Sequence, residues 1–79
     1  MNIHVFPNPS ADQFMLNVQS SSKEKVEIIV ADVYGKKVYQ ASGSGNGKYS
    51  FGKEFISGIY FVQIRQGKNI KTLKLIKGK

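Results

Sequence analysis

Apolar and polar residues alternate along most of the chain, and clusters of turn-forming residues interrupt the alternation about every 8 to 12 residues. A period of two is typical of short, half-buried β-strands, because successive side chains of a strand point to opposite faces. The pattern predicts strands over residues 2–6, 13–18, 25–33, 37–41 and 48–51, followed by a final hairpin over residues 58–77 that turns at residues 67–69.

Two of these segments predict more than a strand. Residues 25–33 are largely apolar on both faces, which is typical of a central strand covered on each side. In the segment that follows, we expect Val38 to lie in the core and Tyr39 to lie on the opposite face.

Short antiparallel strands joined by long crossings predict an all-β fold, a small immunoglobulin-like antiparallel β-sandwich of about seven strands. We expect a single domain over residues 1–79, with Met1 as an added start residue. Gly58 and Tyr60 open the sixth strand, where immunoglobulin-like folds often place a tyrosine whose hydroxyl bonds to the backbone just upstream. The position of Tyr60 therefore predicts such a tyrosine corner.

Turn chemistry marks two further places in the chain. Pro7-Asn8-Pro9 ends the first strand, because proline lacks an amide donor and fixes φ. In the segment from Asp32 through Gly35 to Lys36, the carboxylate can accept amide hydrogen bonds from the residues that follow, and glycine tolerates the positive φ that closes a turn. We predict a four-residue hairpin loop at this second segment.

The net charge is +7, from twelve lysine and arginine residues against five acidic ones. Such a charge fits nucleic acid, an anionic lipid or polysaccharide, or an acidic protein partner. It also fits plain solubility, with lysines protecting strand edges from aggregation. Arg65 is the only arginine, whereas readers of phosphate and base edges favour arginine, so we expect no nucleic-acid partner.

The inventory of reactive side chains argues against catalysis. The chain has one histidine, His4, and no cysteine. Glu24 and Glu27 lie beside Lys23 and Lys25, as in a solvated surface ladder rather than an acid–base pair. We expect no enzymatic activity, no cofactor and no metal site. The longest apolar run, over residues 28–31, is far below the roughly 20 residues of a membrane-spanning helix, so we expect no membrane span.

Three segments in order carry a resemblance to a known family. They are Phe6-Pro7-Asn8-Pro9, Asp32-Val33-Tyr34-Gly35-Lys36, and Ser57-Gly58-Ile59-Tyr60-Phe61-Val62-Gln63-Ile64 with its lysine-rich closing strand. Together they resemble the type A C-terminal sorting domain of the type IX secretion system, over residues 5–77. In that family an aromatic-Pro-Asn-Pro, an Asp-x-x-Gly-Lys/Arg turn, a Gly-x-Tyr strand and a basic last strand follow one another. Phe6 stands where the family more often has tyrosine.

The resemblance implies an address label rather than an activity. A covalently attached N-terminal cargo crosses the inner membrane, and the domain is then recognised in the periplasm by the outer-membrane translocon and its shuttle protein. A sortase typically removes the domain and joins the cargo to an anionic lipopolysaccharide. The implied localisation is the periplasm in transit, followed by secretion or display on the cell surface.

For translocon recognition we expect the final hairpin to be the docking element, with the open edge of its last strand available for strand addition or for lysine contacts. The predicted recognition residues are Gly58, Tyr60, Lys71, Lys74 and Lys77. Pro7, Asn8 and Pro9 are expected to fix the direction of the cargo linker, and Asp32, Gly35 and Lys36 to form a structural turn.

Two other functions are compatible with the pattern. One is a carbohydrate-binding or adhesive β-sandwich module of a secreted enzyme, although sugar platforms favour exposed tryptophan and the chain has none. The other is a passive spacer domain without a partner.

Overall fold

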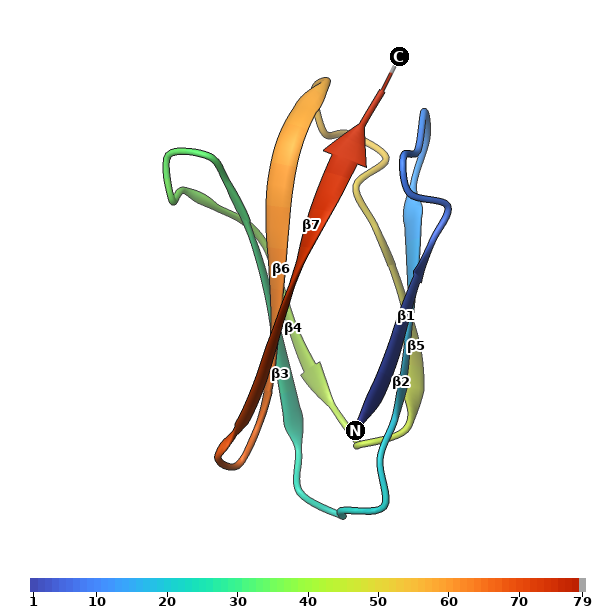
Figure 1. The fold of residues 1–79 in the computed structure, drawn as a ribbon, viewed down its shortest axis with the longest axis vertical. Helices are drawn as coiled ribbons and strands as arrows, with labels where there is room; N and C mark the ends of the chain where they lie inside the picture. The colour runs from blue at the N-terminus through green and yellow to red at the C-terminus, as the bar shows by residue number, and fades with distance from the viewer. Residues whose placement is uncertain (79) are drawn as a thin grey trace.

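The computed structural model describes residues 1–78, which form seven antiparallel strands in two packed sheets (Figure 1). The strands are β1 (Asn2–Phe6), β2 (Phe14–Gln19), β3 (Val26–Asp32), β4 (Lys37–Gly43), β5 (Gly47–Phe51), β6 (Gly58–Gln66) and β7 (Asn69–Lys77). One sheet has the order β1-β2-β5 and the other has the order β4-β3-β6-β7. The predicted all-β sandwich of about seven strands is therefore confirmed.

The strand order places β3 and β6 in the middle of the larger sheet, between β4 and β7. This arrangement matches immunoglobulin-like sandwiches in which the fourth strand pairs with the third, in the same sheet as the sixth and seventh strands. The predicted central position of the strand that begins near residue 25 is confirmed.

The core lies between the two sheets. It is built from every second residue of the strands, because alternate side chains of a strand face inward. Fully buried aliphatic and aromatic side chains come from β2, β3, β6 and β7, so both sheets contribute to one core. The buried set comprises Phe14, Leu16, Val18, Val26, Ile28, Val30, Phe51, Phe55, Tyr60, Val62, Ile64 and Leu75.

The expectation for Tyr39 is wrong, because β4 contains a bulge. Val30 pairs with Tyr39 while the next residue, Ala31, pairs with Lys37, so Val38 is an extra residue in the strand. Tyr39 therefore packs against the core together with Val38. Its ring stacks on Phe51 with a centroid distance of 4.8 Å.

The two termini lie at opposite ends of the sandwich, with Met1 at the bottom of Figure 1 and the end of β7 at the top. At the bottom, the buried Gln66 fastens the β2–β3 loop to the last hairpin. Its amide oxygen accepts from the Ser20 hydroxyl at 2.6 Å, and its amide nitrogen donates to the Glu24 carbonyl at 2.8 Å.

Tyr39 gives a prediction for alkaline pH. Its burial, and then the neighbouring Tyr49, raise the pKa of its phenol above the ordinary value of 10.0. In the unfolded chain Tyr39 ionises near its ordinary pKa, so the native state loses stability as the pH rises from about 10 toward the raised pKa. We expect Tyr39→Phe to make this loss smaller, measured by urea denaturation at about pH 8 and about pH 11.

The matched control is Tyr34→Phe, since the Tyr34 side chain is 92% exposed. This control should show the same decline in stability with pH as the unsubstituted domain. An equal decline in all three proteins would contradict the prediction.

Candidate functional site

The segments that stand out in the sequence meet at one end of the sandwich, the upper end in Figure 1. Asp32 at the end of β3 pairs with Tyr60, Tyr60 pairs with Leu75, and Gly58 pairs with Lys77. The β1–β2 loop, which contains Pro7, bonds to the same end of β7. We call this end the motif end and define it by residues 7–13, 32–36, 52–60 and 74–78.

Asp32 organises the β3–β4 turn as the sequence predicts. Its carboxylate accepts hydrogen bonds from the amides of Tyr34 and Lys36, both at 2.9 Å. The Gly35 amide also donates to the Asp32 carbonyl at 3.0 Å, and Gly35 has a φ of 83°. A positive φ of this size favours glycine, so the two motif residues together fix the conformation of the turn.

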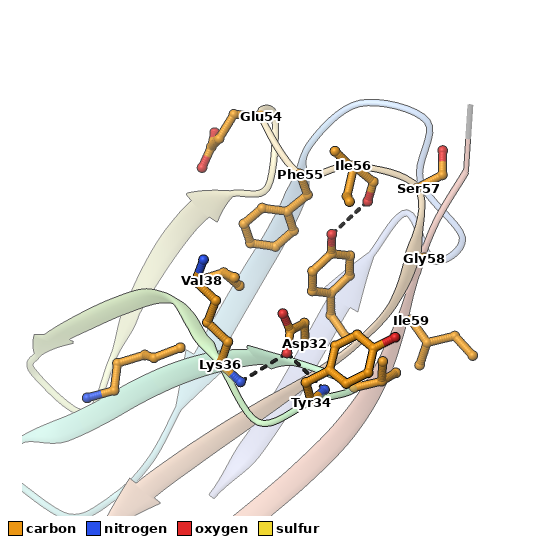
Figure 2. A pocket seen from close by; sticks show the side chains of 13 residues that line it. Asp32, Tyr34, Lys36, Val38, Glu54, Phe55, Ile56, Ser57, Gly58 and Ile59 are labelled. Atoms are coloured by element: carbon orange, nitrogen blue, oxygen red, sulfur yellow. Dashed lines mark hydrogen bonds between the residues drawn. The ribbon is translucent and has the colours of Figure 1, made fainter.

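Tyr60 forms the predicted tyrosine corner. Its hydroxyl donates to the Ile56 carbonyl at 2.7 Å, which ties the start of β6 to the loop that precedes it (Figure 2). The Tyr60 ring also stacks on Phe55, with centroids 4.6 Å apart. Because Tyr60 is only 5% exposed, it acts through the position of the loop rather than as a surface contact.

The β1–β2 loop covers part of the outer edge of β7. The Asn8 side chain donates to the Lys74 carbonyl at 2.9 Å and accepts from the Ile76 amide at 3.0 Å, as a neighbouring strand would do. Ser10 continues this pairing with Ile76 and Gly78. The expectation that the last strand has an open edge is therefore wrong for residues 74–78, because the edge is already paired there.

Lys77 lies inside this end of the molecule. Its ammonium group donates to the carbonyls of Asp12, Gly52 and Lys53, which belong to the β1–β2 loop and the β5–β6 loop. The residue is only 5% exposed. The expectation that Lys77 presents its charge to a partner is wrong, because three loop carbonyls surround the ammonium group.

The other predicted residues differ in exposure. Lys71, Lys74, Gly58 and Lys36 are exposed, whereas Asp32 is half-buried. Pro7, Asn8 and Pro9 are exposed but lie between β1 and β2, at the end of the sandwich away from Met1. The role that we expect for these three residues in directing the cargo linker stays a prediction.

A groove of about 550 Å³ lies between the β3–β4 turn and the β5–β6 loop, and the sequence did not predict it (Figure 2). Most of its lining is apolar, and three of the most exposed apolar side chains of the described residues belong to it. Tyr34 is 92% exposed, Ile56 is 81% exposed and Val33 is 56% exposed. The signal in the sequence is the presence of these apolar residues in turns, where polar residues are common.

Metal-ligand clusters and membrane-spanning helices are both absent from the described residues. Within residues 1–78 no three histidine, cysteine or acidic side chains gather as metal ligands. That same part of the chain has no helix long and apolar enough to cross a membrane.

Comparison with known proteins identifies the family of this chain. Residues 4–78 match the secretion system C-terminal sorting domain family, and no curated protein matched the chain. The chain belongs to this family, a non-catalytic signal domain that directs cargo proteins through the type IX secretion system and across the outer membrane. The family predicted from the three motifs is confirmed.

We expect Tyr60→Phe to lower the free energy of unfolding by about 1 kcal/mol, because it removes the hydrogen bond to the Ile56 carbonyl and keeps the ring. Thermal or urea denaturation measures the change. Tyr34→Phe removes the same hydroxyl from an exposed ring and should have no effect. Equal stability of Tyr60→Phe and the unsubstituted domain would show that the corner bond is dispensable.

We expect Lys77→Met to destabilise the domain by about 1 to 3 kcal/mol, since carbonyls at the motif end lose their donor. Lys74→Met makes the same exchange at an exposed position and should change stability by less than about 0.5 kcal/mol. A larger loss at Lys74 than at Lys77 in urea denaturation would contradict the structural role of the buried ammonium group.

Proposed function

We propose that the outer-membrane translocon and its shuttle protein recognise this domain in the periplasm in its folded state. The cargo is joined at the N-terminal side, a sortase then removes the domain, and the cargo is secreted or remains on the cell surface. The observation that carries the proposal is the meeting of all three family motifs at one end of the fold. Residues far apart in the sequence thereby produce one surface that a single partner can read.

The recognition residues divide into two groups by exposure. Lys74 at the motif end and Lys71, further along β7 opposite Ile64, have exposed side chains and are the residues we assign to direct contact. Tyr60 and Lys77 are buried and bond to loop carbonyls, so their part in recognition is to hold the surface in shape. Gly58 pairs with Lys77 at the start of β6, and we assign it the same role of holding the surface in shape.

A deletion of residues 70–79 is a poor test of this proposal. It removes Leu75 from the core and Lys77 from its three carbonyls, so it disturbs folding together with recognition. Substitutions of exposed side chains separate the two effects, because they leave the core and the buried hydrogen bonds in place.

The test is a reporter that carries an export signal for the inner membrane at its N-terminus and residues 1–79 at its C-terminus. It is expressed in a bacterium with a type IX system and in the same strain without the translocon. We expect delivery outside the cell only in the first strain. The double variant Lys71→Gln/Lys74→Gln should reduce delivery several-fold, with reporter retained in the periplasm, because it removes two exposed positive charges.

The matched control is Lys23→Gln/Lys25→Gln, which removes the same charge from exposed positions in the β2–β3 loop. This control should be delivered like the unsubstituted fusion. Equal delivery with and without the translocon would refute the proposed route. Equal losses in the two double variants would mean that net charge, rather than the final hairpin, governs delivery.

A further inference from the structure

The exposed apolar residues of the motif end have no role in the fold. Ile56 and Tyr34 project from a loop and from a tight turn, and they are 81% and 92% exposed. Exposed apolar groups that gather in one place mark interaction sites more often than scattered ones do. Resting on the proposed function, we propose that the groove between the β3–β4 turn and the β5–β6 loop receives an apolar side chain, flanked by carboxylates, from a protein of the translocation machinery.

The groove is held in shape before any partner binds. Phe55 and Tyr60 stack on each other beneath it, and the Tyr60 hydroxyl fixes the Ile56 carbonyl on one side. On the other side, the Asp32 carboxylate fixes the amide of Tyr34 (Figure 2). A preformed site of this kind loses little conformational entropy on binding, which favours the docking of a single anchor residue.

The charges around the groove indicate the chemistry of the occupant. Lys36 and Lys37 line it and are exposed, while Glu54 is the one acidic residue that lines it besides Asp32. The Asp32 carboxylate is already engaged by two amides of its own turn. The lining therefore carries two basic and two acidic side chains, and the excess of positive charge comes from the domain as a whole, which is +7. An apolar anchor with acidic neighbours fits the apolar groove and this positive domain.

The same charges disfavour a second copy of this chain as the occupant. Each copy carries a net charge of +7, so two copies that meet at lysine-bearing rims repel each other. The apolar lining likewise disfavours a phosphate or sugar group, which would leave its hydrogen-bonding groups without partners in the groove.

The groove continues onto the exposed face of the larger sheet. Ile59 lines the groove and pairs with Ile76, and the next outward residue of β6, Phe61, pairs with Lys74. Ile59, Ile76 and Phe61 are each about two-fifths exposed. A partner anchored in the groove would therefore reach Lys74, one of the two lysines assigned to direct contact.

The groove is tested with the double variant Tyr34→Ser/Ile56→Ser in the reporter fusion. The substitutions keep both local hydrogen bonds, because these use the Tyr34 amide and the Ile56 carbonyl. We expect at least about a tenfold loss of delivery, as the removal of a central apolar contact commonly costs more than 1.4 kcal/mol of binding. The purified domain should unfold at an unchanged urea concentration.

The control is Gln19→Ser, an exposed side chain at the end of β2 that pairs with Asn2, at the opposite end of the sandwich from the groove. We expect full delivery of this control. Normal delivery of the groove variant, while the unsubstituted fusion still depends on the translocon, would overturn the groove proposal and leave the proposed function intact. A fusion that ignores the translocon would instead overturn the proposed function itself.

A photo-crosslinking phenylalanine at position 56 identifies the occupant directly in secreting cells. We expect a crosslink to an acidic segment of a translocon or shuttle component, weakened several-fold by Lys36→Glu/Lys37→Glu. Position 19, at the opposite end of the sandwich, carries the same probe as the control and should not crosslink to that segment. A crosslink at position 56 only to a second copy of the domain or to a glycan, or none at all, would overturn the proposal.

Discussion

The motif end depends on polar side chains that satisfy backbone groups where the strands stop pairing. Asp32 accepts from the amides of its turn, Tyr60 donates to a loop carbonyl, Asn8 pairs with the edge of β7, and Lys77 donates to three loop carbonyls. Buried or tightly turned backbone needs such partners, since an unmade hydrogen bond is costly. The main role of the motif residues in the fold is therefore to fix the conformation of irregular loops.

This explains why side chains expected to contact a partner lie inside the domain instead. A lysine at the end of the last strand looks accessible in a sequence, and Lys77 is indeed followed by only two residues. It points inward because β7 alternates, so Leu75 and Lys77 share the inner face while Lys74 and Ile76 face outward. The recognition surface is left to the neighbours of the motif residues, such as Tyr34 beside Asp32 and Ile56 before Tyr60.

The strands, the two-sheet fold, the Asp32 turn and the tyrosine corner followed from local rules of period and turn chemistry. The strands, the turn and the corner depend on residues close in sequence, and the two-sheet fold followed from the number and spacing of the strands. The position of Tyr39 did not follow, because a single extra residue in β4 reverses the alternation beyond it and the sequence does not mark the bulge. The partial closure of the β7 edge was also not predictable, since it joins Asn8 to Ile76, 68 residues apart.

The placement of the motif end also bears on how one signal can serve different cargo proteins. In the proposed function the cargo joins at the N-terminal side of the domain, the side of Met1. Met1 lies at the end of the sandwich opposite the motif end in Figure 1. In the proposed arrangement, the surface formed by the three motifs faces away from the cargo, so that cargo proteins of different size and charge leave it uncovered. A rigid β-sandwich suits this arrangement, because the antiparallel strands that separate the two ends hold the signal at a fixed distance from the cargo.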